Sequence, residues 1–193
     1  MRRGTRKPEA GGKTVVGVIA DTHGLLRPEA IAALASVDLI VHAGDIGSGT
    51  ILAALGAIAP VVAVRGNNDR DPWAASIPEI VTTEVAGSRL YLIHDLKMLA
   101  DDPAALGVDV IISGHSHRPR VERRAGVLLL NPGSAGPRRF SLPIAVARLT
   151  IGPAGPRAEI VELDVAASAR RRPRATGRRG LDGARVGGAV SPP

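Results

Sequence analysis

Residues 15–45, VVGVIADTHGLLRPEAIAALASVDLIVHAGD, contain the pattern that decides the fold class of this chain. Two mostly apolar runs, residues 15–20 and 38–43, have the length of strands and lack polar alternation, which is typical of strands buried on both faces of a sheet. Between them, Pro28 and apolar residues at helical spacing favour a helix over residues 26–35. A strand, a helix and a second strand in this order predict a parallel sheet.

The alternation continues with Ser48 as the cap of a second helix and a third apolar run at residues 60–65. A short helix is expected near residues 96–106, and a hairpin around residues 86–88. Further strands are expected at residues 80–85, 89–93, 108–113, 120–124, 127–130, 144–151 and 158–163. We therefore expect an α/β fold, a four-layer α/β/β/α sandwich of two mixed sheets with helices outside. One long mixed sheet stays open as an alternative.

The formal net charge of +7 is concentrated at the two ends of the chain. Residues 1–13 carry a charge of +4 and residues 166–193 carry +6, so the part between them is slightly acidic at −3. Both ends lack hydrophobic periodicity, and the second is rich in Arg, Gly and Pro, which is typical of disordered tails. We expect one folded domain over residues 14–165, with a basic tail on each side.

The composition excludes several classes of protein. The chain has no cysteine, so disulfides, thiolate zinc sites and cysteine nucleophiles are ruled out and a reducing cytoplasm is the simplest location. No apolar stretch has the roughly 18 residues of a membrane span, and the apolar run that follows the basic start is too short for a signal peptide. One Phe, one Trp and one Tyr offer little for stacking on bases.

Side chains that bind divalent metals follow five of the apolar runs. They are Asp21 and His23, Asp45, Asn67 to Asp69, His94, and His115 and His117. Because loops that follow parallel strands gather at one edge of a sheet, we expect these side chains to converge. Imidazole, carboxylate and amide oxygen suit Mn, Fe, Zn or Ni, so the pattern indicates a two-metal site. The fifth histidine, His42, lies inside an apolar run, and we expect it to be structural or to support a ligand.

The ordered set of motifs resembles that of the calcineurin-like metallophosphoesterase superfamily. The motifs are DTH (21–23), GD (44–45), GNND (66–69), His94 and GHSH (114–117), followed by NPGS (131–134). With the compact length, NPGS resembles the small bacterial and archaeal phosphodiesterases of that group, over about residues 14–164. This resemblance implies hydrolysis of a small phosphate ester, a phosphodiester rather than a monoester, by in-line attack of a hydroxide that bridges two metals.

The resemblance also implies a ligand set. One metal would be held by Asp21, His23 and His117, the other by Asn67, His94 and His115, and Asp45 would bridge them. The implied cofactors are two divalent ions, with Mn as first choice and Fe, Ni or Zn as alternatives.

Two further positions depart from the family pattern. Many members carry a His at the place of Asn68, where it stabilises or protonates the leaving oxygen, whereas an amide cannot deliver a proton near neutral pH. Asn68 and Asp69 join Asp45 as catalytic candidates, although Asp69 could equally be a turn residue. We expect a preference for good leaving groups. Asp95 stands where relatives commonly have Gly, and we expect it to face solvent.

Two other functions remain open. A retromer subunit shares the implied fold and uses it for protein interaction, so a non-catalytic metal-binding scaffold is the main alternative. The Arg-rich tails would attract nucleic acid non-specifically and in a salt-sensitive way. The sequence does not determine the oligomeric state, and an oligomer is compatible with it.

Overall fold

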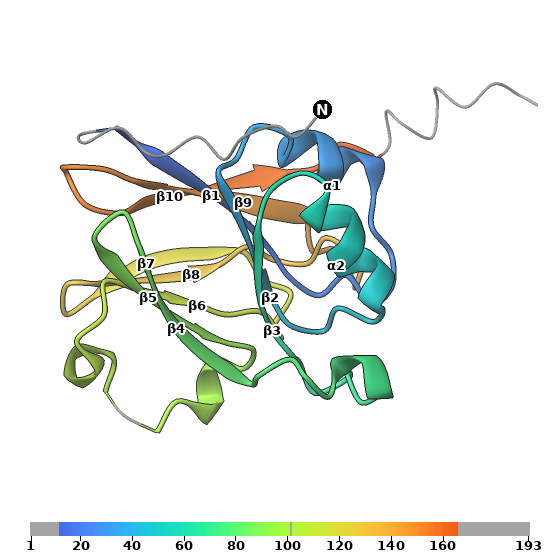
Figure 1. The fold of residues 1–193 in the computed structure, drawn as a ribbon, viewed down its shortest axis with the longest axis horizontal. Coiled ribbons are helices and arrows are strands. Elements are labelled where there is room, and N and C mark those ends of the chain that lie inside the picture. The colour runs from blue at the N-terminus through green and yellow to red at the C-terminus, as the bar shows by residue number, and fades with distance from the viewer. Residues whose placement is uncertain (1–11, 101, 166–193) are drawn as a thin grey trace, which may run out of the picture.

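The computed structural model describes residues 12–100 and 102–165, which form two five-stranded mixed sheets (Figure 1). The first sheet has the order β10-β9-β1-β2-β3, with β1 (Thr14–Ile19), β2 (Leu39–Ala43), β3 (Val61–Val64), β9 (Ala145–Ile151) and β10 (Arg157–Glu162). The second has the order β4-β5-β6-β8-β7, with β4 (Ile80–Val85), β5 (Ser88–Ile93), β6 (Val110–Ile112), β7 (Arg120–Arg124) and β8 (Val127–Asn131). The prediction of two mixed sheets is confirmed.

Each sheet contains three neighbouring parallel strands, on one side of the first sheet and in the centre of the second. In the first, β1, β2 and β3 run parallel while β9 is antiparallel to β1. In the second, β5, β6 and β8 run parallel, and β4 and β7 close the two edges as antiparallel hairpin partners. The hairpin turns use Ala86-Gly87 and Ala125-Gly126, each with two consecutive positive φ angles, as a two-residue turn between twisted strands requires.

The main core lies between the two sheets and is aliphatic. Val16 and Val41 from the first sheet and Leu92, Ile112 and Leu130 from the second are all buried in one cluster. Apolar area removed from water contributes about 25 cal/mol per Å², so this layer supplies most of the force that holds the sheets together. Face-to-face packing places the ends of the central strands of both sheets side by side.

Helices cover the outer face of the first sheet. The two helices are α1 (Pro28–Ala33), whose C-cap is Leu34, and α2 (Gly49–Gly56), which contains Leu55. Both leucines pack with Ile19 and Ile40 of the strands beneath. Ser48 caps α2 as predicted, and its side chain accepts a hydrogen bond from the amide of Thr50. A short 3₁₀ helix, η1 (Pro72–Ala74), precedes β4.

The outer layer over the second sheet is thinner than expected. Instead of one helix over residues 96–106, two 3₁₀ turns form, η2 (Leu96–Met98) and η3 (Pro103–Leu106). Pro103 has no amide to donate, and the residue before it, Asp102, is extended at φ −60° and ψ 130°. Leu96, Leu99 and Leu106 still pack on this face. The α/β/β/α sandwich is confirmed, with a fourth layer of short turns.

Residues 1–11 and 166–193 lie outside the described part of the chain, so the structure does not test the two predicted tails. Within the described part, no helix is both long and apolar enough to cross a membrane.

Candidate metal centre

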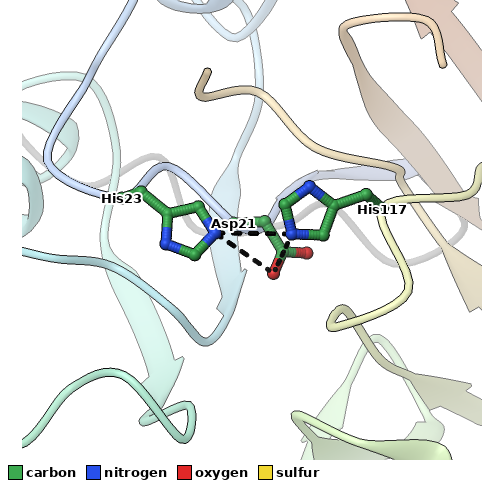
Figure 2. A group of neighbouring side chains, drawn as sticks. All are labelled: Asp21, His23 and His117. Carbon is green, nitrogen blue, oxygen red and sulfur yellow. Dashed lines mark hydrogen bonds and ion pairs between the residues drawn. The ribbon is translucent and has the colours of Figure 1, made fainter. Parts of the chain in front are cut away.

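Asp21, His23 and His117 converge from loops that follow one strand of each sheet (Figure 2). Oδ1 of Asp21 lies 3.3 Å from Nε2 of His117 and 4.0 Å from Nε2 of His23, and the two imidazole nitrogens are 3.4 Å apart. The two rings stack with centroids 5.3 Å apart. Three ligand-type atoms therefore face one point, as a single metal ion requires.

A second group shares Asp21 and adds Asp45 and His94, with one ligand atom of each within 4.8 Å of the others. Oδ2 of Asp45 lies 3.4 Å from Nε2 of His94 and 3.9 Å from Nε2 of His23. This carboxylate thus reaches both groups, as a bridging ligand must. Nδ1 of His94 hydrogen-bonds the carbonyl of Ala43 at 2.8 Å, so as donor it leaves Nε2 with a free lone pair toward the centre.

Buried polar atoms without partners show that these residues fit a cation. Among the described residues, neither oxygen of the fully buried Asp21 side chain has a hydrogen-bond partner, and neither does Nε2 of His94. An ionised carboxylate without hydrogen bonds is costly to bury unless a cation compensates it. These two side chains offer the oxygen and nitrogen donor atoms that divalent transition metals accept.

Electrostatics inside the centre keep Asp45 ionised. Although burial alone raises the pKa of its carboxyl, the contact with His94 and the hydrogen bonds from Asn68 hold the pKa well below its ordinary value. Burial also acts to lower the pKa of His94, but Asp45 and the carbonyl of Ala43 outweigh it, and the pKa is raised. Burial lowers the pKa of His23, partly offset by Asp45 and Asp21.

The backbone at the centre is held in an uncommon conformation. Five of the candidate ligands have positive φ: Asp21 (52°), His23 (46°), Asp45 (53°), His115 (64°) and His117 (57°). Non-glycine residues in this left-handed region persist only where the surroundings enforce it, and they cluster at functional sites. Gly66 permits the close approach of its loop, because a Cβ there would overlap Oδ1 of Asp45.

Asn67 and His115 lie at the rim and interact with each other. Nδ1 of His115 is 3.0 Å from Oδ1 of Asn67, and Nε2 of His115 is 3.5 Å from Oδ2 of Asp95. His115 is half exposed and joins neither group of converging ligands, although its ring packs edge-on against His94. Asp95, expected to face solvent, instead contacts His115 and caps η2 by accepting from the amide of Lys97.

The sequence of this chain is similar to those of known proteins. The model of the family described as the calcineurin-like phosphoesterase superfamily domain matches residues 15–153. The chain belongs to this superfamily. A relative in Methanothermobacter thermautotrophicus, named a probable metallophosphoesterase, is 40% identical over 141 residues, which cover 67% of this chain and 81% of that protein.

Solved structures share the fold at lower identity. An archaeal phosphodiesterase has a TM-score of 0.64 and 21% identity, with 77% of this chain and all of that chain (100%) covered. Vacuolar protein sorting 29 from Cryptosporidium parvum has a TM-score of 0.63 and 22% identity, covering 78% and 98%. The family resemblance is confirmed, and membership supports a metal-dependent phosphoesterase that binds divalent ions.

The carboxylate of Asp69 accepts hydrogen bonds from three backbone amides. Its two carboxylate oxygens accept hydrogen bonds from the backbone amides of Ile46 (3.0 Å), Gly47 (2.8 Å) and Gly66 (2.8 Å). Asp69 is buried, and its carboxylate ties the loop after β2 to the loop after β3. It therefore contacts backbone and positions the segment that carries Asp45.

His42 supports a contact between the loop that carries Asp21 and the loop that carries Asp45. Its Nε2 lies 3.0 Å from the hydroxyl of Thr22, which donates to the carbonyl of Ile46 at 2.8 Å. Because that hydroxyl proton is used, Nε2 of His42 is the donor. Burial, together with nearby His94, lowers the pKa of His42 to about 3, so the ring is neutral. This agrees with the expectation that His42 is not a direct ligand.

The NPGS motif has a structural role that the sequence pattern did not reveal. Asn131 donates from Nδ2 to the carbonyl of Gly114 at 2.6 Å, and its Oδ1 accepts from the amide of Gly133. Ser134 donates to the carbonyl of Asp21 at 2.9 Å. These contacts hold the GHSH loop and the DTH loop against each other. An Asn and a Ser directly after an apolar strand were the available signal.

Proposed function

We propose that this protein is a dinuclear metal-dependent phosphodiesterase that hydrolyses a small phosphate ester. The observation that carries the proposal is the buried carboxylate of Asp21, which has no hydrogen-bond partner among the described residues and is shared by two groups of ligand-type atoms. Two bound divalent ions would supply Lewis-acid polarisation of the phosphate and activation of a water molecule. Mn is our first choice, with Fe, Ni or Zn as alternatives.

The ligand assignment supported by this geometry has two halves. Asp21, His23 and His117 would hold one ion, and His94 would hold the second with Asp45 between them. Asn67 and His115 would complete the second half after giving up their mutual hydrogen bond. The proposed ligand atoms of the first half lie close together in this structure, whereas the second half would include two side chains that lie at the rim.

Asp45, Asp69 and Asn68 would each have a separate role beside the two ions. The depressed pKa of Asp45 keeps a negative charge between the two positions, and Asp69 holds the backbone on which that carboxylate sits. Asn68 lies beside Asp45 with an amide that donates but carries no titratable proton. Phosphodiesters with good leaving groups are therefore favoured, since their departing oxygen needs no proton.

The test is a metal titration followed by an assay with bis(4-nitrophenyl) phosphate. We expect two Mn²⁺ ions per chain by calorimetry and Mn-dependent release of 4-nitrophenolate. Asp45→Ala should lower the rate more than about 100-fold, because the lost group binds both ions. Asp71→Ala, which removes an exposed carboxylate beyond the centre, is the matched control and should leave the rate unchanged.

A non-catalytic scaffold is the second candidate. Two observations favour it: the fold is shared with vacuolar protein sorting 29, and residue 68 is an Asn where many family members carry a His that can donate a proton. Metal binding without turnover on any divalent ion would select this candidate.

The cytoplasmic location expected from the absence of cysteine stays a prediction.

A further inference from the structure

A pocket of about 390 Å³ opens directly beside the second half of the metal centre. His94 and His115 are among its lining residues, together with the large apolar side chains of Ile80, Ile93 and Met98. Its volume falls in the range of small-molecule sites. Whatever ester is held at the metal centre can therefore extend one substituent into this pocket.

Most of the pocket surface is apolar, although the pocket adjoins a polar centre and has charged residues in its lining. Ile80 is 48% exposed and Met98 is 74% exposed, and both are among the few large hydrophobic side chains that the described residues leave open to solvent. Ile80 is the register partner of Ile93 across β4 and β5, so the two side chains lie on the same face of the sheet. Apolar side chains exposed at a concave site indicate an apolar ligand group.

The charges around the pocket do not favour a second anionic group. Arg65, the one Arg or Lys side chain of its lining, forms an ion pair of 2.8 Å with Glu79. Asp95 adds a further carboxylate next to His115. A cation already held by a carboxylate is a weak attractor for another anion, and the extra carboxylate repels one.

We propose that this pocket selects phosphate esters in which one substituent is an uncharged, largely apolar ring. The inference rests on the proposed function, because the phosphate itself would be held at the metal centre. Ile80 and Met98 are then residues that determine specificity, and Arg65 with Glu79 forms the polar rim. A ring that fills the pocket removes apolar surface of both side chains from water.

The test uses phosphonates, which resist hydrolysis and so report binding rather than turnover. Methylphosphonate, phenylphosphonate and 4-phosphonobenzoate are titrated by calorimetry into the full chain loaded with Mn²⁺. We expect phenylphosphonate to bind at least about tenfold more tightly than methylphosphonate, as apolar pockets discriminate by such factors. The added carboxylate of 4-phosphonobenzoate should abolish that advantage.

Two variants test whether the ring of phenylphosphonate binds in this pocket. Ile80→Gln and Met98→Gln, which add a polar group without a charge, should each reduce the preference for phenylphosphonate over methylphosphonate to less than about twofold. Val121→Gln is the matched control, because Val121 is 41% exposed on a strand of the same sheet and lies outside the pocket lining. It should keep the full preference.

The outcomes separate this inference from the proposed function. Equal binding of methylphosphonate and phenylphosphonate by the unaltered protein would overturn the pocket assignment and leave the metal centre intact. Tighter binding of 4-phosphonobenzoate than of phenylphosphonate would show that a charged substituent is preferred, which also contradicts it. If none of the three phosphonates binds the metal-loaded chain, both proposals fail together.

Discussion

Asn68 donates two hydrogen bonds to the carboxylate of Asp45, one from its side chain to Oδ2 at 2.6 Å and one from its backbone to Oδ1 at 2.9 Å. The side-chain amide therefore contacts the same oxygen that approaches His23 and His94. An amide at this position can stabilise negative charge but cannot transfer a proton. Residue 68 is thus placed beside the Asp45 carboxylate without being able to protonate a leaving group.

Replacing Asn68 with His should raise the rate on diesters with poor, alkyl-type leaving groups by about tenfold or more, because an imidazolium can protonate the departing oxygen. Esters of 4-nitrophenol should change little. The measurement is the dependence of kcat on leaving-group pKa, with Asn68→Gln as a control that keeps the amide. If both variants show the same dependence, proton delivery is not what this position lacks.

Asp69→Asn should weaken both the fold and the metal centre. The amide presents an NH₂ group where the carboxylate accepts from Ile46, Gly47 and Gly66, so we expect a loss of about 2–4 kcal/mol in the free energy of unfolding. Metal affinity should fall about 10- to 100-fold. Urea unfolding and metal titration measure the two effects. The exposed Asp71→Asn provides the control, and an equal response of both variants would refute the role given to Asp69.

Alanine should impair the metal centre at one glycine and stabilise the fold at another. A Cβ at Gly66 would overlap the carboxylate of Asp45, so Gly66→Ala should displace that ligand and lower metal affinity by about 100-fold. A Cβ at Gly56 in α2 meets nothing within 4 Å, so Gly56→Ala should stabilise the protein by about 0.5–1 kcal/mol. Thermal unfolding and metal titration of both proteins test the pair. Unchanged metal affinity in Gly66→Ala would contradict the close approach.

Stability at acidic pH should depend on His42. Its pKa is about 3 in the folded protein, against 6.5 for an unperturbed histidine, so the unfolded chain takes up the proton first. The stabilisation is present above pH 6.5 and is lost as the pH falls from there toward 3. The loss amounts to about 1.4 kcal/mol per pH unit.

This pH dependence can be measured in urea between about pH 7.5 and 4.5 with a chelator present, a range that lies within the interval between the two pKa values and just above it. His42→Gln should flatten the slope relative to the unaltered protein, while other titrating groups contribute equally to both. Titration of the His42 ring by NMR is an independent measurement. A ring that protonates near its ordinary pKa of about 6.5 in the folded state would refute the prediction.

Local sequence pattern was sufficient for much of the fold and of the metal centre. Buried parallel strands require apolar runs, and the residues that directly follow them, such as Asp21, Asp45 and His94, reach the carboxyl edge for topological reasons. The split of the helix near residues 96–106 also has a local cause in Pro103, which was visible in the sequence.

Other features depend on contacts between loops of different sheets. His115 lies against Asn67 and Asp95, and Asn131 holds the loop that carries His115 and His117. No periodicity encodes which loops meet, since the relative position of the two sheets comes from their shared core.

The order and chemical type of the ligands were thus contained in the chain as a linear pattern. How far each candidate ligand turns toward the centre, which carboxylate lacks a hydrogen-bond partner among the described residues, and the pocket beside His94 were decided when the two sheets packed. Strand periodicity is a property of neighbouring residues, whereas burial and hydrogen-bond partners across the sandwich arise only once distant segments exclude water together.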